Sequence, residues 1–130
     1  MCIRDRVYTA SEVPRRFIDV ASSLGLLDPG ERVTFFYSDA LLDVRDGMYF
    51  VTDKKVVAYT ADAATPATVV PFWMIEEAEL DSSTSALEDG WITLTLADGE
   101  IVVFPVSSEA GRDQLMFNAI EAGQKAAGVE

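Results

Sequence analysis

The segment from Gly47 to Thr60 constrains the fold of this chain more than any other stretch of its sequence. Aromatic and β-branched residues fill two short runs, Met48–Thr52 and Lys55–Thr60, and the polar pair Asp53-Lys54 separates them. Residues of these types are typical of strands, and a short polar break between two such runs is typical of a hairpin turn. The sequence therefore predicts an antiparallel hairpin here.

Further strands are predicted on both sides of this hairpin: Glu31–Ser38, Val69–Trp73, Glu77–Asp81, Trp91–Leu96 and Ile101–Val106. Asp98-Gly99 joins the last two, and an Asp-Gly pair between alternating strands is a strong signal for a hairpin. In the first of these strands, alternation places Val33, Phe35 and Tyr37 on one face. Seven strands in hairpin succession predict an α+β fold that is mainly antiparallel β.

One helix is predicted before the strands and one after them. Ser11 is a candidate N-cap for the first helix, and Pro14 falls in its first turn, where a missing N–H is harmless. Apolar residues recur at helical spacing in both segments, so each helix has a face that must pack on something. The first face consists of Val13, Phe17, Val20, Ala21 and Leu24. The second helix is predicted from Ser108 to about Gly123, with a face of Leu115, Met116, Ala119, Ile120 and Gly123.

The charge of the chain restricts its partners. Ten lysines and arginines stand against 22 aspartates and glutamates, which gives a formal net charge of −12 at pH 7. Nucleic acids and anionic lipid surfaces are bound through clustered Lys and Arg, so a surface of this charge repels both. We therefore expect no nucleic-acid ligand, and charge disfavours binding to membrane phosphoinositides.

The residues needed for most enzymatic chemistry are missing from the sequence. Histidine is absent, and the single cysteine is Cys2, so the commonest general base and a cysteine-based zinc site are both excluded. There is no glycine-rich phosphate loop, Gly-x-Ser-x-Gly elbow or calcium-loop spacing. The sequence predicts no catalytic residue, no metal site and no cofactor, and hence a protein that is not an enzyme.

Two acidic clusters bear on that prediction. Glu77 and Glu79 share one face of a strand beside Glu76, where they could serve as acid and base. Asp39, Asp43 and Asp46 could collect a divalent cation. A solvated strand face and turn-capping aspartates are the simpler interpretations. We prefer these, and cation binding by the clusters stays open.

Aromatic residues indicate a binding surface instead. Alternation places Trp91 opposite the inward residues Ile92, Leu94 and Leu96, and Trp73 and Met74 fall at the break between two strands. An exposed tryptophan beside an acidic strand is a suitable anchor for a basic protein or peptide. We therefore predict partner binding by Trp73, Met74, Glu77, Glu79 and Trp91; the alternative is that the aromatics cover the helix or the rim of the core.

The order of elements resembles the pleckstrin-homology-like (PH-like) superfold, in its GRAM and bacterial PH branch. The segment from Gly47 to Tyr59 is similar to the signature hairpin of that branch, in which a Thr-Asp turn precedes a basic residue. Val70-Pro71-Phe72 before Ile75, and the Asp98-Gly99 hairpin before the helix, are also similar. The resemblance covers about Glu31 to Gly123. It implies a seven-stranded, partly open barrel capped by the C-terminal helix, with the N-terminal helix as an addition.

Family function transfers poorly because a superfold hosts many activities. The best-known activity that the resemblance implies is phosphoinositide binding by a basic first loop. Here that loop, 39–46, has three aspartates against Arg45, so this sequence departs from the pattern. Lys54 and Lys55, the adjacent lysines of the hairpin turn, are interpreted as a solvated turn.

The chain divides into a predicted N-terminal helix at 7–27, a PH-like barrel with its helix at 28–124, and a frayed tail at 125–130. Codons for residues 1–6, Met-Cys-Ile-Arg-Asp-Arg, resemble the transposase mosaic-end adapter of sequencing libraries. We therefore expect a scar there and leave it out of the fold reasoning. No apolar run is long enough to span a membrane, and we expect a soluble, cytoplasmic domain, with an upstream signal or anchor left open.

Taken together, these features predict a non-enzymatic PH-like or GRAM-like binding module. Its acidic, aromatic-bearing surface would engage a protein or peptide partner or a second copy of the chain, and the charge favours a basic partner. A lipid-binding PH or GRAM domain at a membrane and an acidic inhibitor of the immunity-protein type are the alternatives.

Overall fold

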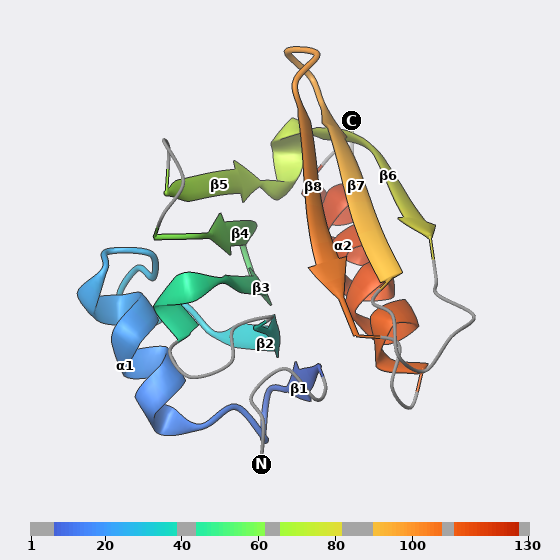
Figure 1. Cartoon of the computed structure of the whole chain (residues 1–130). Helices are drawn as coiled ribbons and strands as arrows, with labels where there is room; N and C mark the ends of the chain where they lie inside the picture. The colour runs from blue at the N-terminus through green and yellow to red at the C-terminus, as the bar shows by residue number, and fades with distance from the viewer. Residues whose placement is uncertain (1–6, 39–43, 62–65, 82–89, 108–110, 128–130) are drawn as a thin grey trace.

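The computed structural model describes residues 7–38, 44–61, 66–81, 90–107 and 111–127. Its strands form two antiparallel sheets (Figure 1). The first sheet has the order β1-β2-β3-β4-β5, with β1 at Tyr8–Thr9, β2 at Val33–Tyr37, β3 at Met48–Thr52, β4 at Lys55–Tyr59 and β5 at Ala67–Pro71. The second has the order β6-β7-β8, with β6 at Ile75–Asp81, β7 at Gly90–Leu96 and β8 at Ile101–Val106.

Two α-helices and two 3₁₀ turns complete the described chain. Helix α1 spans Arg15–Ser23 and α2 spans Arg112–Ala127, while η1 covers Val44–Asp46 and η2 covers Phe72–Met74. The predicted α+β fold, mainly antiparallel with a C-terminal helix, is confirmed. All seven predicted strands are present as β2 to β8, and the two-residue β1 is an addition, paired with β2.

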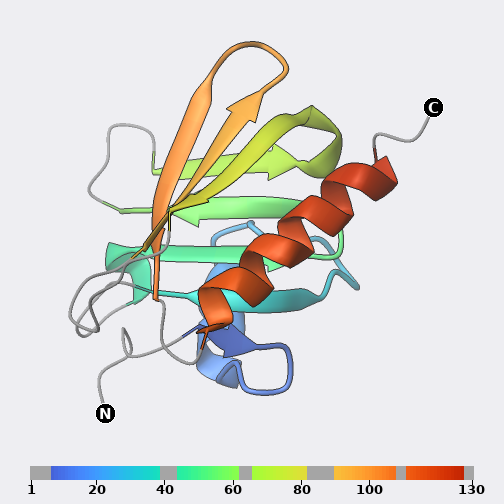
Figure 2. The same ribbon diagram turned by 90° about the vertical axis from the view of Figure 1, so that its right-hand side faces the viewer.

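The two sheets face each other without joining into a closed barrel. No strand of the first sheet pairs with a strand of the second within the described residues. Figure 2 shows the strands of the two sheets crossing, with α2 running diagonally beside them. The Tyr49 and Phe104 rings stack at 5.6 Å between centroids and so link β3 to β8.

The main core lies between the sheets and under α2, which packs against β6, η2 and β3. Met116, Phe117 and Ile120 enter this core from the helix. Leu115 was predicted on the buried face but is 47% exposed, whereas Phe117, which was not predicted, is buried. The buried stripe of α2 is therefore Met116, Phe117 and Ile120, offset by about one residue from the predicted face.

A second core covers the opposite side of the first sheet. Phe17 and Ala21 of α1 are buried there, and Phe17 stacks on Phe36, which stacks on Phe50. Val13, Val20 and Leu24 pack against the same cluster, as the helical pattern predicted. The predicted N-cap at Ser11 is wrong: the cap is Pro14, without a side-chain hydrogen bond, because residues 9–12 form a turn that delays the helix.

A register shift between Val33 and Phe35 interrupts β2. Phe35 and Tyr37 contact the main core, while Val33 lies with Phe36 in the core beneath α1. The prediction that Val33, Phe35 and Tyr37 share one face is therefore wrong for Val33. A bulge adds one residue to the strand and moves every side chain before it to the other face.

Candidate functional site

The outward side of the second sheet brings three of the predicted site residues together. Cross-strand pairing aligns Glu77 with Thr95 and Ile101, Glu79 with Thr93 and Val103, and Asp81 with Trp91 and Pro105. We call this surface the outer face. Its acidic stripe is Glu77, Glu79 and Asp81 on β6, and its apolar stripe is Trp91, Ile101 and Val103 on β7 and β8.

Alternation along the strands creates the outer face. Ile92, Leu94 and Leu96 of β7 are buried in the main core, as predicted, so the residues between them point outward. On β6, a register shift between Ile75 and Glu77 sets the phase so that Ile75 is buried while Glu77, Glu79 and Asp81 are exposed. The bulge therefore lets Ile75 face the core although it lies only two residues before the outward Glu77.

The apolar stripe is accessible to a partner. Trp91 is 48% exposed, Val103 52% and Ile101 64%. The sequence analysis identified Trp91 but missed Ile101 and Val103. Every residue from Ile101 to Val106 is apolar, so alternation could not distinguish the inward residues of β8 from the outward ones.

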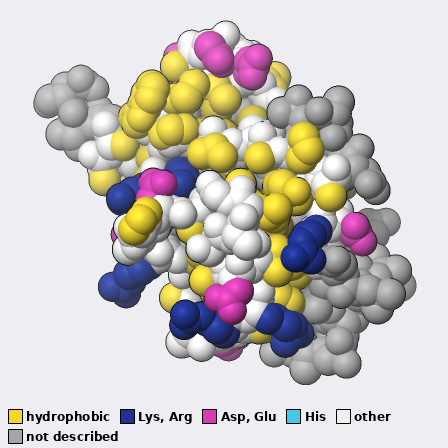
Figure 3. Space-filling model, turned by 90° about the vertical axis from the view of Figure 1, so that its left-hand side faces the viewer, with side chains coloured by type: hydrophobic (Ala, Val, Ile, Leu, Met, Phe, Trp, Pro, Cys, Tyr) yellow, Lys and Arg dark blue, Asp and Glu magenta, His cyan; other side chains and the backbone are white. Residues whose placement is uncertain are grey.

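The outer face lies in a long stretch of sequence that has acidic residues and no basic ones. From Val56 to Gly111 the chain has ten acidic residues and no lysine or arginine. None of the three carboxylates of the acidic stripe forms an ion pair with a described residue. The cationic side chains gather elsewhere, and Figure 3 shows several Lys and Arg on the side of the molecule that carries α1. This run without basic residues is a signal that could have located the surface from sequence.

Trp73 and Met74 lie away from the outer face. Trp73 sits in η2 before β6, while Trp91 pairs with the last residue of β6, so the length of that strand, about 20 Å, separates them. Trp73 is 67% exposed. Met74 is half-buried and packs against the main core, which fits the alternative interpretation that it covers the core.

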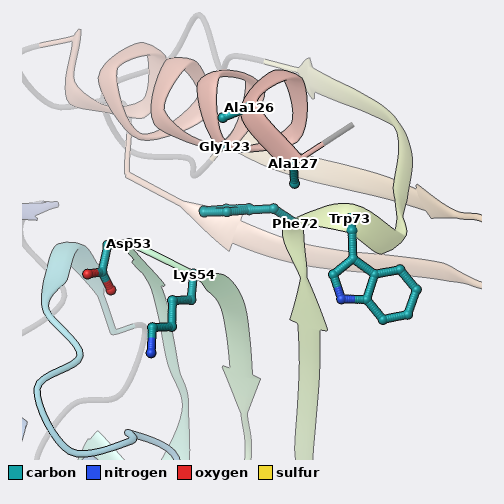
Figure 4. Close-up of a pocket in the computed structure, with 7 residues that line it drawn as sticks. All are labelled: Asp53, Lys54, Phe72, Trp73, Gly123, Ala126 and Ala127. Carbon is teal, nitrogen blue, oxygen red and sulfur yellow. The ribbon is translucent and has the colours of Figure 1, made fainter. Parts of the chain in front are cut away.

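Trp73 borders a shallow groove of about 340 Å³ at the end of α2. Figure 4 shows Phe72 beneath the last turn of the helix, with Lys54 and Trp73 on opposite sides. Asp53, Lys54, Phe72, Trp73, Gly123, Ala126 and Ala127 line the groove. Asp53 and Lys54 place one charge of each sign at its rim, so the groove has no preference for the charge of a ligand.

Acidic side chains hold Lys55 at the hairpin turn between β3 and β4. Lys55 Nζ lies 2.9 Å from Glu31 Oε1 and 3.7 Å from Asp28 Oδ2, so acids already neutralise it. Thr52 Oγ1 donates to Glu31 Oε2 at 2.5 Å and accepts from the backbone N–H of Lys54 and Lys55. This corrects the prediction of a solvated turn at Lys55, whose side chain is only 13% exposed.

Glu31 lies at the centre of these contacts between the β3–β4 turn and the start of β2, which we call the lock. Burial raises the pKa of its carboxyl, but hydrogen bonds from Asp28 N, Thr52 and Lys55, with the charge of Lys55, outweigh that effect and hold the pKa below its usual value. The lock fixes the turn to the start of β2. It also gives the Thr-Asp turn and the basic residue after it a structural role.

No group of three or more His, Cys, Asp or Glu side chains could hold a metal ion in the part of the chain that the structure describes. Asp46 belongs to η1, whereas Asp39 and Asp43 of the proposed cation cluster, and Ser108, the predicted start of the second helix, lie outside the described residues. In that same part of the chain, no helix is long and apolar enough to cross a bilayer.

Comparison with known proteins identifies the fold. No family model matches the sequence, and no curated protein matches it. A DUF1696 family protein with a pleckstrin-homology domain from Shewanella loihica PV-4 has a similar structure, with a TM-score of 0.60 and 14% identity over 92% of this chain and 96% of that one. A pleckstrin-homology domain from Shewanella amazonensis SB2B has a TM-score of 0.56 and 12% identity, over 82% and 86%. The chain therefore has a PH-like fold.

Proposed function

We propose that this protein is a non-enzymatic binding module that holds a basic protein or peptide on its outer face. One observation carries the proposal: three carboxylates that form no ion pair with a described residue lie beside an exposed tryptophan and two exposed aliphatic side chains on one sheet. Aromatic anchors next to complementary charge are typical of sites that bind protein partners. A PH-like fold is consistent with a binding module, although the fold alone does not specify a partner.

Electrostatics favour a different, basic protein over a second copy of this chain. An interface between two outer faces would contain both acidic stripes and no lysine or arginine from either face to neutralise them, and excess like charge in an interface is costly. A basic partner would instead neutralise Glu77, Glu79 and Asp81. The same argument disfavours a lipid head group, since a phosphate would meet the carboxylates of the outer face, and Lys55 beside the hairpin turn is already paired.

The proposal is tested by affinity capture with the full chain. We compare the wild type with Glu77→Gln/Glu79→Gln and with Trp91→Ala. The control is Asp19→Asn/Asp46→Asn, which removes the same number of charges from α1 and η1. We expect the wild type and the control to retain the same basic proteins and both outer-face variants to lose them.

Equal capture by all four proteins would reject the outer face as the binding surface. Two further measurements test the alternatives. Sedimentation equilibrium would show self-association, and sedimentation with phosphatidylserine vesicles would show lipid binding. Salt-sensitive vesicle binding that survives both outer-face changes would replace this proposal with a membrane function.

A further inference from the structure

Side chains occupy part of one free edge on each sheet. On β1, Thr9 N–H donates to Glu12 Oε1 at 3.2 Å and Thr9 O accepts from Glu12 N–H at 2.9 Å. On β6, the Gln124 side-chain amide donates to Ile75 O at 3.1 Å and Glu76 O at 2.9 Å. These contacts occupy backbone groups of Thr9 on β1 and of the first two residues of β6, which a partner strand would otherwise use.

Prolines limit the remaining two edges. Two hydrogen bonds fix which residues of β8 and β5 face the free edges: Leu96 N–H donates to Glu100 O, and Phe72 N–H donates to Lys54 O. Hydrogen-bonded and non-hydrogen-bonded pairs alternate in antiparallel ladders. With the observed registers, Pro105 of β8 and Pro71 of β5 both fall at positions whose backbone faces the free edge. Each edge thus lacks an N–H where a partner strand would need one.

The outer face has the dimensions of a helix-binding surface. Neighbouring strands lie about 4.8 Å apart, so the acidic stripe on β6 and the aliphatic residues on β8 are separated by about 10 Å. A helix with its side chains is about 10 to 12 Å wide. The alternate residues of each stripe span about 14 Å, which corresponds to about nine residues of helix.

Resting on the proposed function, we infer that the partner presents an amphipathic basic helix, which lies along the strands of the outer face. Its apolar side covers Trp91, Ile101 and Val103, and lysines or arginines along one flank reach Glu77, Glu79 and Asp81. The corresponding sequence pattern has apolar residues at i, i+4 and i+7 and basic residues at i+1, i+5 and i+8, since these two sets form adjacent stripes on a helix.

The experiment uses the full chain and a synthetic 14-residue peptide, which is long enough to include the nine residues of contact, with leucine and lysine in that pattern. A second peptide contains the same residues rearranged so that leucine and lysine alternate, which favours a strand. A third places proline at the centre of the helical peptide. Amide chemical shifts locate the binding, and titration calorimetry gives the affinity of each peptide.

We expect the helical peptide to shift the amides of 77–81, 91–95 and 101–103, and to bind more tightly than the other two. Glu77→Gln/Glu79→Gln should weaken it by roughly five- to tenfold, as expected for two partly exposed ion pairs, while Asp19→Asn/Asp46→Asn should leave the affinity unchanged. Val103→Ser should also weaken it.

Three results would overturn the inference. They are equal or tighter binding of the alternating peptide, binding of the helical peptide away from the outer face, and no binding of any peptide. Each of them leaves the proposed function to be judged by the capture experiment. Loss of the captured proteins in the outer-face variants would keep that function even if the helix inference fails.

Discussion

The side-chain amide of Gln124, near the end of α2, donates a hydrogen bond to the backbone carbonyl of Glu76 at 2.9 Å. The same nitrogen reaches Ile75 O at 3.1 Å. These contacts join the C-terminal helix to the first residues of β6, where the register shift occurs. The helix therefore caps the start of the β6 edge as well as covering the core.

Replacing this residue tests its role at the edge. Gln124→Ala should lower the free energy of unfolding by about 1 kcal/mol, because two carbonyl groups lose a shared donor in a partly buried place. Amide hydrogen exchange in residues 75–81 should become faster. Gln114→Ala is the matched control, since Gln114 bonds to Asn118 on the exposed surface of the same helix. Equal effects of the two changes on β6 exchange would contradict this role.

Close packing at Gly123 gives a second prediction. A Cβ at this position would lie 2.5 Å from the ring of Phe72, which is buried in the main core. Alanine normally stabilises a helix by about 1 kcal/mol relative to glycine. Here we expect Gly123→Ala to destabilise the protein by about 1 to 3 kcal/mol through overpacking. Adding Phe72→Leu, which replaces the ring with a smaller side chain, should recover part of the lost stability, as measured by urea denaturation.

The pKa of Glu12 should report its contact with α2. The guanidinium of Arg112 binds both carboxylate oxygens, at 2.5 and 3.2 Å. Together with the Thr9 backbone N–H, it lowers the pKa of Glu12 to about 2 from the usual 4.5. In an NMR titration, Arg112→Gln should raise this pKa towards 4.5. Arg15→Gln, which removes a guanidinium paired with Asp19 instead, should leave the pKa of Glu12 where it is.

Acid should weaken the lock at the β3–β4 turn. The folded pKa of Glu31 lies below its usual value of 4.5, so the stability that its ionised form adds is present above about pH 4.5 and is lost as pH falls through the folded pKa. At pH 7, Glu31→Gln should cost about 1 to 3 kcal/mol, because Thr52 and Lys55 lose a charged partner. In urea denaturation the difference between wild type and variant should shrink as the pH is lowered. A difference that is constant with pH would contradict the lock.

Fluorescence separates the two tryptophans. Trp91→Phe leaves Trp73 as the probe, and Trp73→Phe leaves Trp91. Both tryptophans are largely exposed in the free protein, so acrylamide should quench both variants. Addition of the helical peptide should protect Trp91 and not Trp73, because about 20 Å of β6 lies between them. Protection of Trp73 alone would place the binding site in the groove at the end of α2.

Much of the architecture was predictable from local patterns. The bounds of β3 agree with the prediction at both ends, and the inward set Ile92, Leu94 and Leu96 was correct. In both places the sequence alternates or is bounded by turn residues, so neighbouring positions already determine the structure. The acidic residues of β6 and the exposure of Trp91 could be expected for the same reason.

Other features depended on contacts with distant parts of the chain. Val33 lies on the opposite face from the predicted one because of a bulge in β2. On α2, Phe117 is buried and the predicted Leu115 is exposed. Ile101 and Val103 could not be assigned a face because their whole strand is apolar. The separation of Trp73 from Trp91, and the capping of the start of β6 by Gln124, follow from the paths of β6 and α2.

By itself, then, the sequence determined the kinds of element, their order and the excess of negative charge. These properties come from residue type and from spacing along a few neighbouring positions. Tertiary structure alone decided which apolar residues remain outside, which strand edges are capped and which candidate residues share a surface. Such outcomes depend on burial and hydrogen bonds between segments far apart in the chain, and local periodicity contains no information about them.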